Sequence, residues 1–250
     1  MPTGVPPESF RGRVALVTGG SGGIGQAISL ALAAEGALVA VHYSRQRDAA
    51  DQVAAQITGQ GGRAVVLGAD LSSATAPGEL VTATEQALGP IDLLVSNAGL
   101  GQRRTLEELT TAEFDRTLAV NLRAPFLLAQ RVLPAMRDRR FGRSLFVSSV
   151  AGFTGGIVGP HYASSKAGLH GLIHFLAARF AADGITVNGL APALIADTGM
   201  LPGEPSELAR RVPVGRLGQP AEVADLALAV LRNGYLTNQV ISLDGGTYPH

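Results

Sequence analysis

The sequence predicts an α/β protein with one parallel sheet covered by helices on both faces. Short apolar runs recur along the 250-residue chain and alternate with longer segments whose apolar residues have helical spacing. Each run is apolar at consecutive positions, which is typical of strands buried on both faces. A glycine-rich stretch between the first run and the first helical segment is typical of doubly wound sheets. We therefore expect a doubly wound, Rossmann-type fold.

The strands are expected at the apolar runs and the helices between them. The expected strands are 14–17, 38–41, 64–67, 91–95, 144–147, 185–190 and 240–243, and the expected helices are 23–35, 48–60, 75–88, 111–139, 160–182, 204–211 and 221–232. Pro134 lies inside the fourth helix and is expected to bend it. The proline-rich residues 1–10 are expected to form a flexible tail. No linker-like stretch divides residues 11–250, which are expected to form a single domain.

Composition excludes several classes of protein. The chain carries 20 basic and 20 acidic residues, so nothing favours a nucleic acid as a partner. It has no cysteine, which excludes disulfides and thiol catalysis, and its five histidines form no metal-ligand pattern. No apolar run reaches the ~18 residues of a membrane span, and the N-terminus lacks the pattern of a signal peptide. We expect a soluble, cytoplasmic protein without a metal or a membrane partner.

The glycine-rich stretch 18–25 predicts a site for a dinucleotide. Glycines let the backbone turn tightly and approach a pyrophosphate, and the following helix offers N–H groups and a partial positive charge at its start. The order strand, glycine turn, helix favours this interpretation over a plain glycine-rich turn.

The end of the second strand indicates which dinucleotide is bound. An acidic residue at this position would bind the 2′-hydroxyl of the ribose. Here no acid occurs before Asp48, whereas Arg45 and Arg47 could bind a 2′-phosphate. We therefore predict NADP(H), with Arg45 the better candidate, and keep NAD(H) as the alternative, in which both arginines face solvent.

Two later strand ends carry further candidates. Asp70 follows the third strand and could accept from the amino group of adenine or cap the next helix; the sequence leaves both open. The stretch from Asn97 to Gly99 follows the fourth strand, where small residues would let the backbone pack along the cofactor.

Tyr162 and Lys166 are four residues apart in a helix expected to begin at Pro160, so they share one face. An ammonium fixed beside a phenol favours the phenolate and would lower the pKa of Tyr162 towards a value useful for proton transfer. Alone, the pair would be an ordinary surface tyrosine and lysine. The glycine turn and the strand ends favour the catalytic interpretation.

Together these motifs resemble the classical short-chain dehydrogenase/reductase family. The matching residues are Thr18, Gly19, Gly23, Ile24, Gly25, Asn97, Ala98, Gly99, Asn121, Ser149, Tyr162 and Lys166, in the order and spacing of the family. The stretches 213–223 and 244–246 look most like the 3-oxoacyl-acyl-carrier-protein reductase branch. The resemblance covers about residues 11–246 and implies a sheet of about seven strands in the order 3-2-1-4-5-6-7. It also implies a homotetramer.

The resemblance implies a role for each catalytic position. Tyr162 would be the general acid in reduction and the base in oxidation, Lys166 would lower the pKa of Tyr162 and hold the nicotinamide ribose, and Ser149 would bind the substrate carbonyl. Asn121 would hold a water of a proton relay. Ser149 could instead cap a helix, with Ser148 as the competing candidate, and Asn121 could be a polar residue satisfied by the backbone.

The glycine turn, the strand ends and the resemblance together predict the cofactor contacts. They are Gly19, Ser21, Gly22, Gly23, Ile24, Gly25, Tyr43, Ser44, Arg45, Asp70, Leu71, Asn97, Ala98, Gly99, Tyr162, Lys166, Pro192, Ile195 and Thr198. Ala193 replaces a glycine that is frequent in the family, so the loop beside the nicotinamide would differ if a positive φ is needed there. Asn238 also replaces a glycine, and asparagine tolerates the left-handed region.

The substrate cavity is expected between the segments 99–104, 151–158 and 194–201. Its candidate lining residues are mostly apolar: Phe153, Ile157, Val158, Met200 and Leu201. They favour a small carbonyl or alcohol substrate of moderate hydrophobicity, either free or linked to a carrier. Arg103 and Arg104 could meet an acidic carrier protein or be solvated loop charges, and His161 could point into the cavity or away from it.

We therefore predict an oxidoreductase that transfers hydride between NADP(H) and a carbonyl or secondary alcohol, with a 3-oxoacyl thioester as one candidate substrate. The alternatives are an NAD(H)-dependent alcohol or sugar dehydrogenase and a non-catalytic NADP-binding regulatory subunit. A methyltransferase would share the glycine turn but would not need the Tyr162–Lys166 pair.

Overall fold

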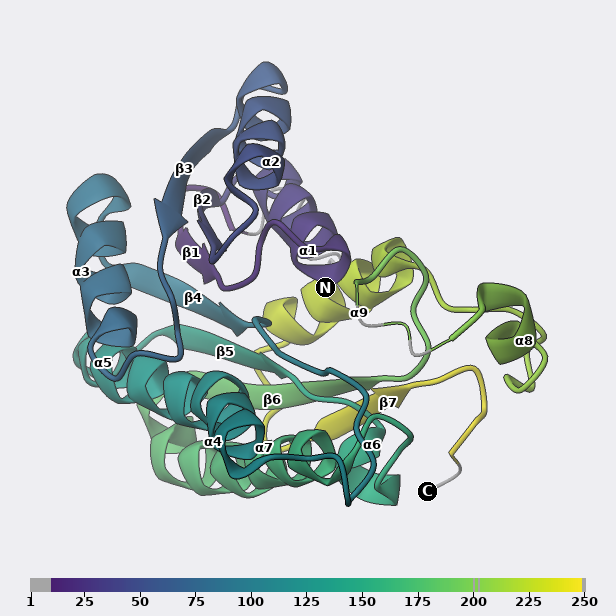
Figure 1. Ribbon diagram of the computed structural model, residues 1–250. Helices are drawn as coiled ribbons and strands as arrows, with labels where there is room; N and C mark the ends of the chain where they lie inside the picture. Colours follow the sequence, from purple (N-terminus) through teal and green to yellow (C-terminus); the bar gives the residue numbers. More distant parts are fainter. Residues whose placement is uncertain (1–9, 200, 202, 249–250) are drawn as a thin grey trace.

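A seven-stranded parallel sheet forms the centre of the protein (Figure 1). The structure, a computed structural model, describes residues 10–199, 201 and 203–248. The strands are β1 (Val14–Val17), β2 (Leu38–Tyr43), β3 (Arg63–Gly68), β4 (Ile91–Ser96), β5 (Gly142–Val147), β6 (Ile185–Pro192) and β7 (Val240–Leu243). Their order in the sheet is β3-β2-β1-β4-β5-β6-β7, which confirms the predicted topology.

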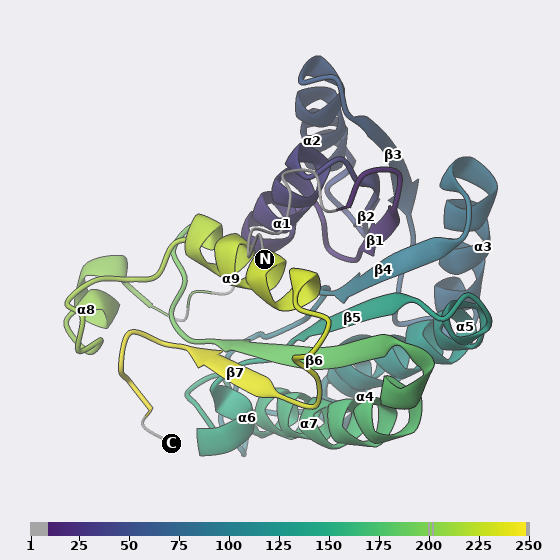
Figure 2. The same cartoon turned by 180° about the vertical axis from the view of Figure 1, so that it is seen from behind.

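Helices cover both faces of the sheet. They are α1 (Gly23–Ala34), α2 (Arg47–Gly59), α3 (Ala76–Leu88), α4 (Thr111–Leu118), α5 (Ala124–Asp138), α6 (Ala151–Thr154), α7 (Pro160–Phe180), α8 (Pro205–Ala209) and α9 (Pro220–Arg232). Figures 1 and 2 show α1, α2 and α9 on one side of the sheet and α3, α5 and α7 on the other. Successive strand residues point to opposite faces, so a strand between two helical layers must be apolar at every position.

The central strand β1 shows why continuous apolar runs form this sheet. All four of its residues are buried. Ala15 and Val17 belong to the core shared with α1, α2 and α9, whereas Val14 and Leu16 belong to the core shared with α3, α5 and α7. The interpretation as a strand buried on both faces is therefore confirmed for β1, whereas the edge strands β3 and β7 are only partly buried.

The long helix expected over 111–139 is divided into three parts. Helix α4 begins with a capping box between Thr110 and Glu113, a π-helical segment occupies Ala119–Arg123, and α5 follows with Pro134 inside it. The π-helical segment adds a residue to the turn that carries Asn121. The prediction of one uninterrupted helix was therefore wrong, as was the omission of the short helix α6.

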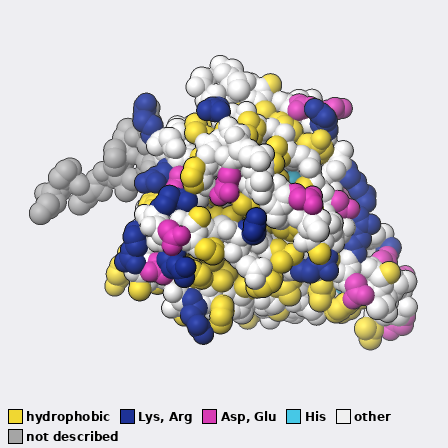
Figure 3. Space-filling model, turned by 90° about the vertical axis from the view of Figure 1, so that its left-hand side faces the viewer, with side chains coloured by type: hydrophobic (Ala, Val, Ile, Leu, Met, Phe, Trp, Pro, Cys, Tyr) yellow, Lys and Arg dark blue, Asp and Glu magenta, His cyan; other side chains and the backbone are white. Residues whose placement is uncertain are grey.

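Phe10 corrects the predicted boundary of the N-terminal tail. Its side chain is 2% exposed and belongs to the core beside α1, so the domain includes it. The rest of the predicted tail, residues 1–9, lies outside the described residues. Among the described helices, none has both the length and the apolarity that a membrane span requires. On the face shown in Figure 3, cationic, acidic and apolar side chains are interspersed.

Candidate active site

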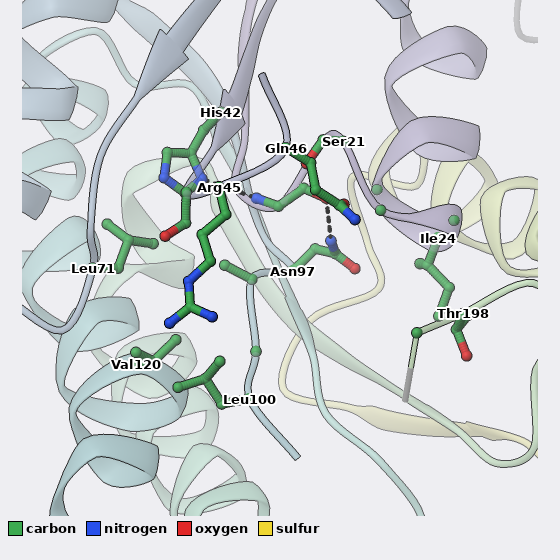
Figure 4. A pocket seen from close by; sticks show the side chains of 18 of the residues that line it. Ser21, Ile24, His42, Arg45, Gln46, Leu71, Asn97, Leu100, Val120 and Thr198 are labelled. Carbon is green, nitrogen blue, oxygen red and sulfur yellow. Dashed lines mark hydrogen bonds between the residues drawn. The ribbon is translucent and has the colours of Figure 1, made fainter. Parts of the chain in front are cut away.

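Two adjoining cavities lie at the carboxyl ends of the strands. The first has a volume of about 460 Å³ and the second about 290 Å³. Ile24, Asn97 and Thr198 line both, so the cavities meet between the glycine turn and the loop that follows β6. Figure 4 shows the first cavity, with Thr198 and Ile24 on one side and Arg45 on the other.

The first cavity contains most of the predicted cofactor contacts. Its lining includes Gly19, Ser21, Gly22, Gly23, Ile24, Gly25, Ser44, Arg45, Asp70, Leu71, Asn97, Ala98, Gly99 and Thr198. Pro192 and Ile195 line the second cavity together with Ser149, Tyr162 and Lys166. All predicted catalytic and cofactor-binding residues are described, and of these Tyr43 and Asn121 line neither cavity. The ring of Tyr43 lies against Gly68 of β3.

The glycine turn is packed so tightly that several of its positions require glycine, among them Gly19 and Gly25. Gly19 has a φ of 65°, in the left-handed region. A Cβ on Gly25 would clash with the carbonyl oxygen of Gly19 and would lie 2.6 Å from Nδ2 of Asn97. The start of α1 can therefore approach the turn closely, which leaves room for a pyrophosphate at its N-terminus.

Hydrogen bonds join this turn to the end of β4. The backbone N–H groups of Asn97 and Ala98 donate to Oγ1 of Thr18, both at 3.0 Å. The side chain of Asn97 donates to the carbonyls of Thr18, at 3.0 Å, and Gly19, at 3.2 Å. Asn97 and Ala98 thus hold the glycine turn as well as lining the cavity.

Arg45 and Arg47 differ in position, and the difference bears on cofactor choice. Arg45 lines the cavity and extends into it towards Leu71 and Val120 (Figure 4). Arg47 begins α2, pairs with Asp51 at 3.4 Å, and its side chain is 72% exposed. Of these two arginines, Arg45 is therefore the one that lines the first cavity.

Asp70 does not cap the next helix. Its carboxylate accepts from the backbone N–H of Ser72 at 3.0 Å and from the hydroxyl at 2.8 Å, while the N-cap of α3 is Thr75. These two hydrogen bonds, with the nearby charges of Arg116 and Arg45, hold the pKa of Asp70 below its usual value. Asp70 is therefore an ionised acceptor in the lining of the first cavity, and the alternative that it caps the helix was wrong.

His42 and Arg116 are site residues that the sequence analysis missed. His42 accepts from the backbone N–H of Gly19 at 3.0 Å and donates from Nε2 to the carbonyl of Ala69 at 3.0 Å, which ties the glycine turn to the end of β3. Burial lowers the pKa of His42, so its neutral form fits these roles. Arg116, on α4, lines the first cavity beside Asp70. No local pattern marks either residue, because both reach the cavity through tertiary packing.

Tyr162 and Lys166 project from the start of α7 into the second cavity. Both are buried, and Nζ of Lys166 donates to the carbonyl of Val147 at 2.8 Å. Nζ lies 5.6 Å from the centre of the Tyr162 ring. The pair therefore shares one helical face, as the spacing predicted.

The electrostatics differ from the expectation. Burial raises the pKa of Tyr162, and a hydrogen bond with the hydroxyl of Ser149 opposes this rise. Burial also lowers the pKa of Lys166 to about 8. The expected fall in the pKa of Tyr162 is thus wrong for the protein alone, because desolvation of the phenol raises the pKa more than the hydrogen bond with Ser149 lowers it. At neutral pH Tyr162 is protonated, which suits a proton donor.

The two serines that competed for the substrate carbonyl have different partners. Ser148 donates to the carbonyl of Lys166 at 3.2 Å, and its hydroxyl also lies 2.8 Å from Nε2 of His170. Ser149 faces the phenol of Tyr162 and accepts from the backbone N–H of Ala151 at 3.2 Å. Ser149 therefore also holds the first turn of α6, and it is the serine beside Tyr162.

Asn121 is fixed by the loop after β4. Its Oδ1 accepts from the N–H of Leu100 at 2.7 Å, and its Nδ2 donates to the carbonyl of Leu100 at 2.8 Å and to the hydroxyl of Ser165 at 3.0 Å. The polar atoms of the Asn121 side chain thus have hydrogen-bond partners within the protein, which agrees with the alternative that Asn121 is a polar residue satisfied by the backbone. A role in a proton relay stays a prediction.

The walls of the second cavity are mostly apolar. Ile157, Val158 and Leu201 line it as expected. Phe153 does not: its ring contacts His170, with centroids 4.4 Å apart, and stacks on Tyr248 at 5.7 Å. Met200 lies outside the described residues.

The polar residues at the edge of this region point elsewhere. His161 is 1% exposed, and its Nε2 hydrogen-bonds the carbonyl of Gln102 at 3.1 Å. Arg104 pairs with Glu113 at 2.7 Å, which helps to lower the pKa of Glu113 to about 2, while Arg103 is exposed. His161 and Arg104 are thus bound to other parts of the chain.

Comparison with known proteins agrees with this geometry. The family model described as short chain dehydrogenase matches residues 13–208. The chain is 40% identical to an acetoacetyl-CoA reductase of Shinella zoogloeoides, with 94% of this chain and 98% of the relative covered. It is 36% identical to a 3-oxoacyl-[acyl-carrier-protein] reductase of Synechocystis, with 94% and 96% covered. The chain belongs to the short-chain dehydrogenase family.

A solved structure supports the same assignment. The 3-oxoacyl-(acyl-carrier-protein) reductase from Agrobacterium tumefaciens, solved with NADP bound, has a TM-score of 0.90 and 36% identity to this short-chain dehydrogenase. The alignment covers 97% of this chain and 98% of the other. The protein is therefore an oxidoreductase of this family.

Two departures from the family pattern do not disturb the fold of this short-chain dehydrogenase. Ala193 is not among the residues with positive φ, and its N–H donates to the carbonyl of Leu243 at 3.1 Å, so alanine is accommodated. Asn238 has a φ of 66°, as its replacement of glycine predicted. Within the described residues, no three histidine or carboxylate side chains are placed to hold a metal ion.

Proposed function

We propose that this short-chain dehydrogenase uses NADP(H) to interconvert a ketone and a secondary alcohol. The observation that carries the proposal is the meeting of Ser149 and Tyr162 in an apolar cavity that adjoins the glycine turn. Two hydroxyl groups beside each other can bind one carbonyl oxygen from the substrate. The tight contact of Gly25 with Gly19 supports a nicotinamide dinucleotide in the first cavity, since it clears the start of α1 for a pyrophosphate.

Each side chain then has a stated task in reduction. Ser149 donates to the carbonyl oxygen and orients it, and Tyr162 donates to the same oxygen and transfers its proton as negative charge develops there. The raised pKa of Tyr162 keeps this proton in place before reaction. Lys166 keeps a positive charge near the phenol and can supply donors to a ribose. When bound, NADPH supplies the hydride.

Cofactor selection is proposed to depend on Arg45. It is the arginine at the end of β2 that lines the first cavity, and Arg116 on α4 also belongs to this lining. A 2′-phosphate would gain charge-assisted hydrogen bonds from the guanidinium of Arg45. NAD(H) lacks that phosphate, and no carboxylate at the end of β2 replaces it. NADP(H) is therefore favoured over NAD(H).

The proposed substrate class is a 3-oxoacyl thioester or a ketone of similar size. The mostly apolar wall suits an acyl chain, and two relatives carry the names acetoacetyl-CoA reductase and 3-oxoacyl-[acyl-carrier-protein] reductase. We also propose that the protein is a homotetramer in the cytoplasm.

Two alternative functions are outcomes of the experiments. One is an alcohol or sugar dehydrogenase that uses NAD(H), and the other is a non-catalytic NADP-binding subunit.

The decisive experiment compares NADPH oxidation by the wild type, Tyr162→Phe and Tyr235→Phe. The substrates are acetoacetyl-CoA and a panel of ketones. Tyr235 is 97% exposed and serves as the matched control. We expect kcat to fall at least about a hundredfold in Tyr162→Phe, because general acid catalysis contributes roughly that factor or more, and to stay unchanged in Tyr235→Phe. Unchanged turnover in Tyr162→Phe would refute the mechanism. NADPH binding without turnover of any substrate would favour the regulatory subunit.

A second experiment tests cofactor choice. We expect Arg45→Gln to weaken NADPH binding about tenfold or more, since a hydrogen bond to a charged group contributes about 1.5–3 kcal/mol, and to leave NADH binding nearly unchanged. Arg47→Gln is the control, because Arg47 is outside the cavity. Nicotinamide fluorescence measures both affinities. Equal loss in the two variants, or tighter binding of NADH by the wild type, would contradict the role of Arg45.

A further inference from the structure

The second cavity has an uneven distribution of charge. Its described lining contains two charged side chains, Lys166 and Arg211, and both are cationic. Lys166 is buried at the catalytic end, whereas Arg211 is exposed and follows α8. No carboxylate side chain belongs to this lining in the described part of the chain. The lining therefore offers a substrate a second positive charge besides that of Lys166.

Arg211 differs from the two arginines near it in sequence. Nε of Arg210 donates to the carbonyl of Ser206 at 3.2 Å, and Arg210 does not line the cavity. Arg216 makes two hydrogen bonds to Glu222, at 2.9 and 2.6 Å. Within the described residues, the guanidinium of Arg211 has neither a carboxylate nor a carbonyl partner. It is thus available for a ligand in the cavity that it lines.

We infer that Arg211 determines specificity, and that the substrate carries an anionic group beyond its carbonyl. The inference rests on the proposed function and names a feature of its substrate. An arginine guanidinium matches a carboxylate or a phosphate with two parallel hydrogen bonds. The anion is either a carboxylate of the substrate itself or a phosphate of a thioester carrier.

The volume of the cavity limits the part of the substrate that lies inside it. A water molecule in the liquid takes up about 30 Å³. At a similar volume for each non-hydrogen atom with its hydrogens, the 290 Å³ of this cavity accommodates on the order of ten non-hydrogen atoms. Straight-chain oxo acids of about five to seven carbons are of this size. Their apolar methylene groups match Ile157, Val158 and Leu201 in the wall.

The test measures kcat/KM for NADPH-dependent reduction of paired substrates. The first pair is a series of oxo acids of five, six and seven carbons with a terminal methyl ketone, against their methyl esters. The second pair is acetoacetyl-CoA against the neutral acetoacetyl-N-acetylcysteamine thioester. Each is measured with the wild type, Arg211→Gln, Arg211→Lys and the control Arg210→Gln.

We expect Arg211→Gln to lower the ratio of anionic to neutral kcat/KM about tenfold in at least one pair, as for a partly exposed charge-assisted hydrogen bond. The loss should lie in KM, and Arg211→Lys should restore part of it. A loss confined to the oxo acids identifies a carboxylate on the substrate, and one confined to the CoA thioester identifies a carrier phosphate.

An unchanged ratio in both pairs, or an equal change in Arg210→Gln, would overturn the inference. The Tyr162→Phe experiment distinguishes this failure from failure of the proposed function. If the wild type reduces the neutral substrates and Tyr162→Phe does not, the reductase activity stands even where the role assigned to Arg211 fails.

Discussion

Lys166 offers the sharpest physical test of the site, through the replacement Lys166→Met. Its ammonium group is fully buried, and burial lowers its pKa from 10.5 to about 8. The folded protein therefore binds this proton less tightly than the unfolded chain does. Methionine fills a similar volume without a charge, so Lys166→Met removes the cost of burying the ammonium.

The magnitude follows from these two pKa values. Below pH 8 the lysine is charged in both states, and the difference between them corresponds to about 3 kcal/mol of lost stability. Between pH 8 and 10.5 the unfolded chain binds more protons than the folded protein, so the stability of the wild type rises with pH. At pH 10 the remaining cost is about 1 kcal/mol. The lost hydrogen bond to Val147 offsets about 1 kcal/mol throughout.

We therefore expect Lys166→Met to be more stable than the wild type by about 2 kcal/mol at pH 7 and about equally stable at pH 10. Urea unfolding at both pH values measures this. The sequence contains a single lysine, so labelling with [13C]lysine gives one Cε resonance whose titration reports the pKa of Lys166 directly. A midpoint near 10.5, or a stability difference that does not change with pH, would refute the reasoning.

Two further predictions concern the backbone contacts around the site. Gly25→Ala should destabilise the fold by about 1–3 kcal/mol and weaken NADPH binding at least about tenfold. The reason is that the added Cβ would lie against the carbonyl of Gly19 and 2.6 Å from Nδ2 of Asn97. NADPH binding as tight as in the wild type would contradict this close approach. Asn121→Leu should lower the free energy of unfolding in urea by about 2–4 kcal/mol, because it leaves the N–H and carbonyl of Leu100 without their partner. Asn121→Asp keeps one acceptor and should lower it by less. Equal losses of stability in the two variants would contradict this account.

Much of the fold could be predicted because its strands are apolar at consecutive positions. β1 and β4 are buried along their whole length, and no amphipathic pattern competes with that interpretation. The division of the segment 111–139 could not be predicted. Its π-helical turn accompanies the bonds of Asn121 to Leu100 and Ser165, which are distant in sequence, and helix propensity does not detect such contacts.

The residues of the site also divide into those that the sequence could predict and those that it could not. Gly25 and the Tyr162–Lys166 pair could be found because local spacing fixes their geometry. Arg116 and Arg211 could not, since each reaches a cavity through the packing of a separate helix or loop. The pKa of Tyr162 was predicted with the wrong sign for a related reason. Spacing showed the neighbouring ammonium but not the burial of the phenol, which dominates.

The segment after β4 connects the two cavities physically. Asn97 bonds the glycine turn, and Leu100 bonds Asn121. Between them, a Cβ on Gly99 would lie 3.5 Å from Oδ1 of Asn121 and 3.6 Å from Nζ of Lys166. The four consecutive residues 97–100 thus lie against the glycine turn, the π-helical segment and Lys166. Because one short backbone segment lies against all three parts of the site, a substitution that shifts this segment should change cofactor affinity and kcat together. Arg45→Gln and Arg211→Gln should instead act separately, the first on the first cavity and the second on the second cavity.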